Sequence, residues 1–267
     1  MKKLIKQLLP HSLSQFIRLR NQNKQLSRLD RIKLNVSHLS SSFNDHSLKE
    51  VFVSREITAE WPQVEQEVSS FSLAETAGGV NVGDRRAIYY LLRHLRPRSV
   101  LEVGTHIGAS SVHAVAALRK TREQGGPGAR FTTVDICNVN DPKTKPWLSW
   151  GSKWSPREMI HKMGAAEWVQ FITKPSLEFL SATGEGFDFI FLDGDHCAKT
   201  VYQEIPAALD HLNPNGVILL HDYFPNAKPL WKGEPLFWGL GWRGNAFNLR
   251  VPSSRFYPWE NSLGLRN

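Results

Sequence analysis

The sequence predicts a doubly wound α/β domain with a mainly parallel sheet, preceded by a basic N-terminal extension. Five short apolar runs, each typical of a buried strand, alternate with segments of helical periodicity between residues 83 and 222. Most of these runs end in a glycine turn or a carboxylate, at the edge where ligands bind in a parallel sheet. The 267 residues suffice for one such domain with appendages.

The N-terminal extension carries the net charge. Residues 1–34 hold nine basic residues and one acidic residue, so they account for the formal charge of +8, and the remaining chain is balanced. This balance argues against nucleic acid as a partner. The first residues resemble a secretory signal, but Lys6 and Gln7 interrupt the apolar run and Pro10 ends it. The segment either contacts an anionic membrane surface or a partner, or is a solvated helix or frayed tail.

The chain is expected to consist of an extension, a lead-in and one domain. Residues 1–45 are interpreted as the basic extension and a polar linker, residues 46–82 as a helical lead-in, and residues 83–267 as the domain. A substrate-facing tail is expected from about residue 223. The two cysteines exclude a disulfide scaffold and favour a reducing, cytoplasmic location. No run approaches the ~20 apolar residues of a transmembrane helix.

The first half of the domain begins with a helix. Asp84 is expected to cap it, apolar residues follow at helical spacing, and Pro97 stops it. A buried strand then runs over 99–104 and ends in a glycine turn. A second helix ends before the glycine-rich breaker at 125–128, and the next strand occupies 131–136.

The second half repeats this alternation after an insertion at 141–154 that is rich in proline and tryptophan. Ser155, with Pro156 and Glu158 after it, predicts a helix that starts with a capping box. Further strands are expected at 168–173, 187–194 and 216–222. A helix marked by Val201, Ile205, Leu209 and Leu212 should precede the last strand, with a turn at 213–216.

The turn after the first strand differs from a dinucleotide-binding fingerprint. Its glycines, Gly104 and Gly108, are spaced G-x-x-x-G instead of G-x-G-x-x-G, and Glu102 precedes them. A carboxylate there would repel a pyrophosphate but suits S-adenosylmethionine, which has a sulfonium, an ammonium and a ribose diol. Asp135, at the end of the second strand, can accept hydrogen bonds from both ribose hydroxyls. On the turn alone, glycines that serve only its geometry explain the motif equally well.

With the other strand ends added, the chain resembles the class I S-adenosylmethionine-dependent methyltransferases, which have a Rossmann-type fold. The motifs are LEVGTHIGASS, TTVD, FDFIFLDGDH and LNPNGVILLHDY, in this order. More narrowly, roughly residues 79–223 resemble the cation-dependent O-methyltransferases, including those acting on catechols, caffeoyl-CoA and antibiotic sugars. The resemblance implies that Asp135 holds the ribose and that Ser176 lies near the adenine. It also implies that the cofactor is bound by Glu102, Gly104, Thr105, His106, Gly108, Ser110 and Asp193.

The same resemblance implies a divalent-cation site. A cation would lower the pKa of the substrate hydroxyl and fix its position. Asp193 and Asp222 stand where the family places two carboxylate ligands, whereas His221 falls on the position of a third oxygen ligand. Oxygen ligands suit Mg²⁺, but an imidazole suits Mn²⁺, Fe²⁺ or Zn²⁺ better. Either the metal differs from Mg²⁺ or metal dependence is lost.

His196 is the candidate general base. It follows Asp193 by three residues, where related enzymes carry a lysine or histidine base, and histidine titrates near neutrality. Asp193, beside it, is the second candidate catalytic residue. The alternative is a histidine that caps the next helix or binds a neighbouring carboxylate, and Asp195 is expected to cap that helix.

These residues predict an enzyme that transfers a methyl group from S-adenosylmethionine to a hydroxyl of a small molecule or sugar. One alternative is a repurposed enzyme of the same fold. Another is a non-catalytic cofactor- or metal-binding module, attached by its basic N-terminus to a membrane-associated assembly. The tryptophans outside the strands either anchor loops or contact the substrate; they are Trp147, Trp150, Trp154, Trp231, Trp238, Trp242 and Trp259.

Overall fold

One parallel sheet organises the domain and confirms the doubly wound α/β fold. The computed structural model describes residues 20–21, 24–25, 27–29, 50–75, 80–221 and 256–258. The strand order is β3-β2-β1-β4-β5-β6, and every neighbouring pair is parallel. The chain therefore winds outward from β1 in both directions, which leaves a switch point between β1 and β4. The strands are β1 (Ser99–Val103), β2 (Arg130–Asp135), β3 (Val169–Thr173), β4 (Phe187–Leu192), β5 (Leu212–Leu220) and β6 (Phe256–Pro258).

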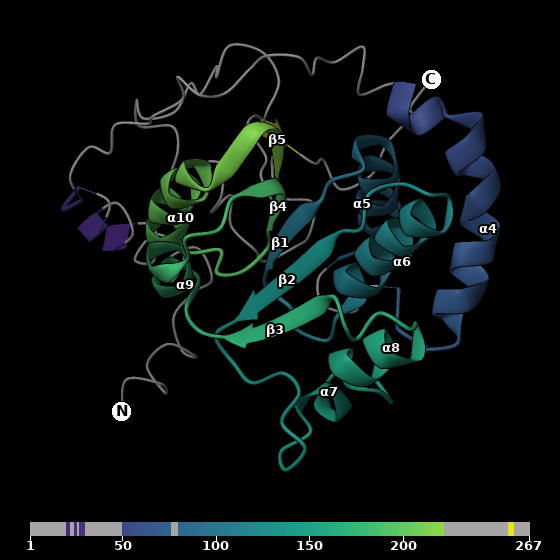
Figure 1. The fold of residues 1–267 in the computed structure, drawn as a ribbon. Helices are drawn as coiled ribbons and strands as arrows, with labels where there is room; N and C mark the ends of the chain where they lie inside the picture. The colour runs from purple at the N-terminus through teal and green to yellow at the C-terminus, as the bar shows by residue number, and fades with distance from the viewer. Residues whose placement is uncertain are drawn as a thin grey trace.

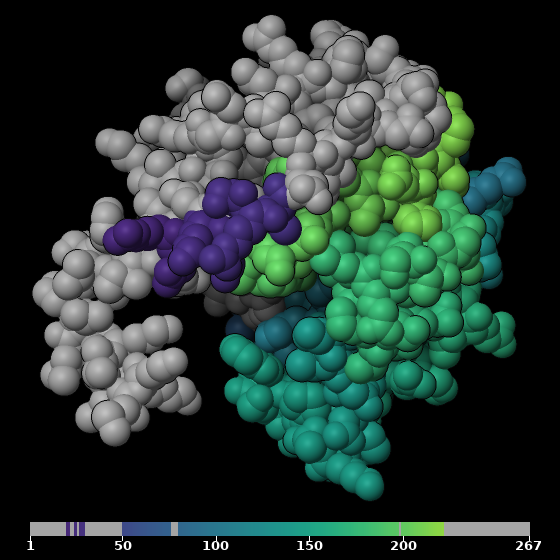
Figure 2. Space-filling model, turned by 90° about the vertical axis from the view of Figure 1, so that its left-hand side faces the viewer, coloured from purple at the N-terminus to yellow at the C-terminus, as the bar shows by residue number. Residues whose placement is uncertain are grey.

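Helices cover both faces of the sheet (Figure 1). On one face, α5 (Val82–Leu95) and α6 (Ala109–Glu123) pack together, with α4 (Arg55–Ser69) and α8 (Pro156–Lys162) beside them. On the other face, α9 (Ser176–Ala182) packs against α10 (Ala198–Asp210). The short helix α7 (Pro146–Ser149) lies in the insertion after β2, and this teal segment projects from the body of the domain in Figures 1 and 2.

Neighbouring residues of β1 point alternately into two hydrophobic cores. Val100 belongs to the core under α5 and α6, whereas Leu101 and Val103 belong to the core under α9 and α10. All five residues of β1 are buried, as expected for a parallel strand that is covered on both faces. The carboxyl end of β1 is therefore held rigidly from both sides.

The lead-in segment shares a core with the domain. Ile57, Trp61, Val64 and Val68 of α4 are buried in the cluster that contains the apolar residues of α5 and α6. The indole of Trp61 also contacts the ring of Tyr89 in α5, with the ring centroids 5.5 Å apart. Helix α4 is thus one layer of the fold, outside α5 and α6.

Local sequence signals explain several helix ends. The capping box predicted at Ser155 is confirmed, because its hydroxyl accepts the Glu158 N–H while the Glu158 carboxylate accepts the Ser155 N–H. The start of α5 differs from the prediction. Asn81 is its N-cap and accepts the Asp84 N–H at 3.1 Å, so Asp84 lies in the first turn of the helix.

The boundary between α10 and β5 also differs from the prediction. Helix α10 ends at Asp210, and β5 begins at Leu212, so the turn expected at 213–216 lies within the strand. The pairing of β5 with β4 shifts register between Phe187 and Phe189, which accommodates these residues as an irregularity in the ladder.

Some predicted features lie outside the described residues. They are most of the basic segment 1–34, the metal-ligand candidate Asp222, and the tail tryptophans Trp231, Trp238, Trp242 and Trp259. Where the chain is described, no helix is both long enough and apolar enough to cross a membrane. Cys137 and Cys197 are both exposed, and neither forms a disulfide within the described part of the chain.

Candidate functional site

A cavity of about 610 Å³ lies at the carboxyl edge of the sheet, at the switch point between β1 and β4. This volume is typical of small-molecule sites. Val103, Val134, Ile136 and Leu177 give it an apolar lining, and three carboxylates, Asp135, Asp193 and Asp195, give it negative charge. The remaining lining residues are Gly104, His106, Lys174, Pro175, Ser176, Gly194, His196, Thr200 and His221.

The glycine turn after β1 brings the backbone close to β4. Gly104 has a φ of 97°, and a Cβ atom there would lie 2.1 Å from the Asp193 carbonyl oxygen, so only glycine fits. Gly108, with a φ of 76°, is the N-cap of α6, where a Cβ would crowd Pro156 at 3.1 Å. Gly104 lines the cavity and Gly108 does not. The G-x-x-x-G spacing therefore follows from turn geometry, and one of the two glycines opens the backbone to the cavity.

Glu102 lies beneath the turn and not in the cavity lining. It is 1% exposed and accepts hydrogen bonds from the hydroxyls of Ser110, Ser111 and Thr133. Burial raises the pKa of Glu102 to about 7, against the lowering effect of these three hydroxyls. Thr105 joins the same network through Thr133, with the two hydroxyl oxygens 2.6 Å apart. These side chains support the turn from below.

Glu102, Thr105, Gly108 and Ser110, which the resemblance predicts to bind the cofactor, are not among the residues that line this cavity. By contrast, Gly104, His106, Asp135, Ser176 and Asp193 all line the cavity. Each of these five stands at or just after the end of a strand, which is the property on which their prediction depended.

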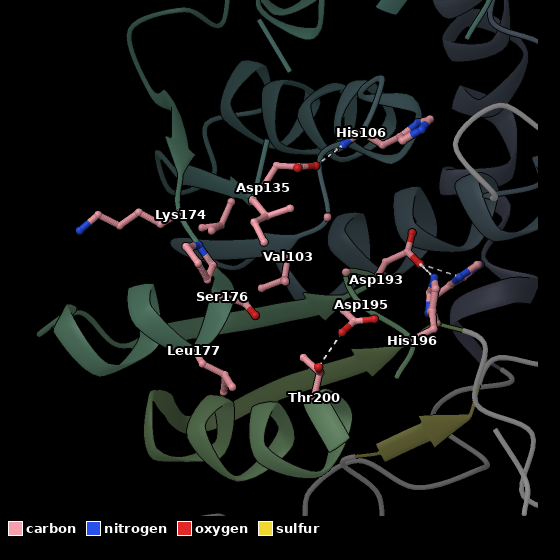
Figure 3. Close-up of a pocket in the computed structure, with 16 residues that line it drawn as sticks. Val103, His106, Asp135, Lys174, Ser176, Leu177, Asp193, Asp195, His196 and Thr200 are labelled. Carbon is pink, nitrogen blue, oxygen red and sulfur yellow. Dashed lines mark hydrogen bonds and ion pairs between the residues drawn. The ribbon is translucent and has the colours of Figure 1, made fainter. Parts of the chain in front are cut away.

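Asp135 closes β2 and is fixed by the backbone around it. Its Oδ2 accepts the His106 N–H at 2.9 Å, and its Oδ1 accepts the Cys137 N–H at 2.8 Å (Figure 3). Each carboxylate oxygen has a second lone pair, so Asp135 retains capacity for two further donors at the cavity. The Lys174 N–H donates to the Asp135 carbonyl at 2.9 Å, which holds the loop after β3 beside it.

Ile136 is a cavity residue that the sequence interpretation missed. It was counted as the last residue of the second strand, but β2 ends at Asp135 and the Ile136 side chain is 70% exposed. An apolar side chain that directly follows a strand-ending carboxylate is the signal that could have indicated it. Together with Leu177, it supplies apolar surface next to Asp135 and Ser176.

A histidine lies between two buried aspartates on the β4–β5 side of the cavity. His221 Nδ1 is 2.8 Å from Asp193 Oδ1, and His221 Nε2 is 3.2 Å from Asp84 Oδ2. The exposed fractions of these side chains are 3% for His221, 6% for Asp193 and 2% for Asp84. Asp84, in the first turn of α5, was missed as a site residue because its position predicts only a helix cap.

This arrangement does not fit the predicted divalent-cation site. Both ring nitrogens of His221 already face carboxylate oxygens, so neither is directed at a cation with Asp193. Within 50–75 and 80–221, no group of three or more histidine, cysteine or acidic side chains could hold a metal ion. The third predicted ligand, Asp222, is not among the described residues. In the described structure His221 is instead hydrogen-bonded to Asp84 and lies within ion-pair distance of Asp193.

His196 faces Asp193 from the mouth of the cavity (Figure 3). Its Nε2 lies 3.8 Å from Asp193 Oδ1, and its side chain is 38% exposed. Asp195 points elsewhere and accepts hydrogen bonds from the Cys197 N–H and the Thr200 hydroxyl, at the start of α10. The prediction that Asp195 caps this helix is wrong, because the N-cap is Cys197 and no side chain caps α10. Asp193 is the carboxylate that contacts His196.

The tryptophans of the insertion divide into two groups. Trp147 is 7% exposed and packs with Ile107, and the Trp154 ring lies under the Lys162 ammonium at 4.1 Å from the ring centroid. Trp150 is 62% exposed, and its ring meets the His106 ring edge-on with a centroid separation of 4.6 Å. Trp150 therefore contacts a residue of the cavity lining without lining the cavity itself.

The fold and the site together define a class of protein. A parallel sheet of this order, with a glycine turn after β1 and a cavity-facing carboxylate at the end of β2, is typical of doubly wound domains that bind nucleoside-containing ligands. Residues 101–223 match a family model described as "Methyltransferase domain". This part of the chain is therefore similar to the methyltransferase domains that the model describes.

One curated relative is similar to part of the chain. "O-methyltransferase hkm8" of Aspergillus hancockii is 32% identical over 130 residues, which cover 48% of this chain and 43% of that protein. The chain thus matches less than half the length of this curated relative.

Solved structures similar to the chain include an O-methyltransferase of Bacillus cereus in complex with SAH and the methyltransferase PaMTH1 of Podospora anserina, also bound to SAH. The first is 22% identical with a TM-score of 0.41 and covers 65% of this chain and 70% of its own. The second is 19% identical with a TM-score of 0.42 and covers 80% of this chain and 86% of its own.

Proposed function

We propose that this protein is an S-adenosylmethionine-dependent O-methyltransferase that acts on a hydroxyl of a small molecule or sugar. The observation that carries the proposal is Asp135, a carboxylate fixed at the cavity wall beside the Gly104 turn. Its remaining lone pairs suit a ribose diol, and the excess of carboxylates in the lining suits a cationic ligand better than a polyphosphate. Ile136 and Leu177 supply apolar surface against which the adenine ring can pack.

When bound, S-adenosylmethionine supplies an electrophilic methyl group on its sulfonium. The acceptor hydroxyl must lose its proton as the new oxygen–carbon bond forms, and the chain has to take that proton. His196 is the general base in this proposal, because its imidazole is partly exposed where it lines the cavity. Asp193 orients the imidazole and stabilises the imidazolium that forms.

The chain of buried groups behind Asp193 supports this role. His221 holds Asp193 Oδ1 at 2.8 Å and is itself held by Asp84, so the Asp193 carboxylate has a fixed orientation next to the cavity. The described residues therefore favour a protein side chain, and not a divalent cation, as the group that activates the acceptor hydroxyl. Metal assistance, the other device expected for this family, requires ligands beyond Asp193 and His221.

Calorimetry with S-adenosylhomocysteine tests the proposal, followed by a methyl-transfer assay on catechols and sugars with and without EDTA. We expect micromolar or tighter binding, about −8 kcal/mol or better. We expect transfer to persist in EDTA. Absence of binding by the folded protein would refute the proposed function. Loss of transfer in EDTA with unchanged binding would instead show that the acceptor is activated by a metal.

We further propose that residues 1–34 attach the protein to anionic membrane surfaces. The support is the charge of this segment, which holds the entire net charge of the chain. Deleting residues 1–34 should abolish sedimentation with phosphatidylserine vesicles and leave the affinity for S-adenosylhomocysteine unchanged. Equal sedimentation of the truncated and full-length chains would exclude this role.

A further inference from the structure

Large apolar side chains are exposed at and after the end of β2. Among the described residues, they include Ile136, Leu148 and Trp150, whose side chains are 70%, 56% and 62% exposed. Ile136 lines the cavity, whereas Leu148 and Trp150 do not. Apolar side chains that gather in one exposed segment mark an interaction surface more often than single ones do. Leu148 and Trp150 therefore call for a partner outside the cavity.

The fold holds Leu148 and Trp150 in these exposed positions. Their neighbour Trp147 is 7% exposed and packs with Ile107, so it anchors α7 to the domain. The turn after α7 is closed on the Trp147 carbonyl, which accepts the N–H groups of Trp150 at 3.2 Å and Ser152 at 3.0 Å. The teal segment that carries them projects from the body of the domain in Figures 1 and 2. The two apolar side chains are thus presented on a projection with a defined backbone.

Cationic side chains flank the two apolar ones. Lys143, Lys145 and Lys153 are all exposed. Residues 137–154 contain these three lysines and one acidic residue, Asp141. Asp141 accepts the Lys143 N–H at 2.9 Å, so its carboxylate is engaged within its own turn. The segment therefore combines exposed apolar side chains with a net positive charge, which complements an anionic surface.

A lipid surface fits this combination better than the other occupants do. Tryptophan is enriched at membrane–water interfaces, and lysine can keep its ammonium at the head groups while its methylene stem covers apolar surface. A symmetric contact with a second copy of the chain would bring the lysines of both copies together. A small molecule in the cavity would not cover Leu148 or Trp150, because neither lines the cavity.

We propose that residues 143–153 form a surface that docks onto an anionic lipid bilayer. Leu148 and Trp150 enter the interface, and the lysines contact the lipid head groups. The Trp150 ring meets the ring of His106 with the centroids 4.6 Å apart, and His106 lines the cavity. Docking therefore brings this wall of the cavity next to the membrane. The inference depends neither on the basic segment 1–34 nor on methyl transfer.

Sedimentation of the full chain with lipid vesicles tests the docking surface. The vesicles contain phosphatidylcholine alone or mixed with phosphatidylserine, and the wild type should bind the mixed vesicles at least about tenfold more strongly. Leu148→Ser and Trp150→Ser should each weaken this binding by about tenfold, because a large apolar side chain no longer enters the lipid. Val53→Ser is the matched control. Val53 is 73% exposed in the helical lead-in, so this variant should bind as the wild type does.

A second measurement places Trp150 at the lipid. Brominated phosphatidylcholine in the mixed vesicles quenches tryptophans that reach the acyl chains. Trp150→Phe keeps an apolar ring in the surface but removes this fluorophore, and the other tryptophans are common to both proteins. The wild type should therefore lose a larger share of its fluorescence than Trp150→Phe when both are bound.

Three results would overturn the inference. The first is wild-type binding by Leu148→Ser and Trp150→Ser, with thermal unfolding showing that both variants fold; any attachment would then belong to residues 1–34. The second is equal binding to both kinds of vesicle, or equal quenching of the wild type and Trp150→Phe. The third is a wild type that binds neither vesicle, which would leave the surface to a protein partner. None of these results bears on the proposed methyl transfer, which calorimetry with S-adenosylhomocysteine tests separately.

Discussion

Asp135 presents the cavity with a carboxylate whose two oxygens are each held by one backbone N–H. Asp135→Ala removes the charged acceptor expected to bind the ribose hydroxyls. The affinity for S-adenosylhomocysteine should therefore fall by about 10- to 100-fold, since hydrogen bonds to a charged group are worth roughly 1.5–3 kcal/mol. Calorimetry measures this loss. Asp141→Ala is the control, because Asp141 is an exposed carboxylate in the same loop that binds only local groups. Unchanged affinity in folded Asp135→Ala would remove the ribose assignment.

His196 and Asp193 face each other at the cavity mouth, with His196 Nε2 3.8 Å from Asp193 Oδ1. His196→Ala should lower kcat by roughly 10²- to 10⁴-fold, the usual contribution of a general base, and change the affinity for S-adenosylhomocysteine little. Steady-state assays together with calorimetry separate the two effects. His161→Ala, in the last turn of α8 and outside the cavity, should behave as wild type. Full activity of His196→Ala would assign the proton to another group.

At the residue scale, the sequence predicts which residues line the cavity best where those residues directly end a strand. It predicts this less well for residues that are buried beneath the turns. His106, Asp135 and Asp193 face the cavity, because the carboxyl ends of parallel strands meet at one edge. Glu102 could not be distinguished from them, since its three hydroxyl partners depend on how α6 packs over the turn. Asp84 could not be found at all. It reaches His221 across 137 residues of sequence, and no local pattern encodes that contact.

At the scale of elements, one arginine links three helices. Arg93 of α5 is hydrogen-bonded to Glu60 of α4, to Thr121 of α6 and to Gln124, the C-cap of α6, and its side chain is 1% exposed. Arg93→Ala leaves the Glu60 carboxylate, itself 10% exposed, without its cationic partner. The free energy of unfolding should drop by about 3–5 kcal/mol, which urea denaturation measures.

The control for this prediction is an arginine on the surface. Arg130 is 70% exposed and lies 3.8 Å from Glu185, so Arg130→Ala should cost less than about 1 kcal/mol. A similarly small cost for Arg93→Ala would show that Glu60, Thr121 and Gln124 find other partners, and that the network does not hold α4 in place.

Elements with strong periodicity were predictable, but their boundaries depended on contacts from elsewhere in the chain. The capping box at Ser155 is a local signal and was identified correctly. The start of β5 was not, because Asn213 to Gly216 is typical of a turn. In the folded domain, the Asn213 side-chain amide donates to Asp188 Oδ1 of β4 at 2.8 Å, and the pairing of β5 with β4 resumes at Val217 after a register shift.

At the scale of the whole molecule, the two carboxylates with raised pKa values make stability depend on pH. Glu102 of β1 and Glu204 of α10 are both buried, and burial raises the pKa of each from 4.5 to about 7. Between these pH values the unfolded chain releases a proton that the folded chain retains. Ionising the folded chain is therefore harder, and the free energy of unfolding falls as the pH rises from about 4.5 to about 7.

Glu102→Gln removes one of these ionisations. Between pH 5 and pH 8, the free energy of unfolding of the wild type should therefore fall by about 2 kcal/mol relative to that of Glu102→Gln. Urea denaturation at both pH values measures the shift, and comparison within each pH cancels the titration of all other groups. Glu178→Gln, a surface change on α9, should run parallel to the wild type. Parallel behaviour of Glu102→Gln as well would mean that the three hydroxyls hold Glu102 ionised in the folded protein, and that the turn after β1 rests on a buried charge.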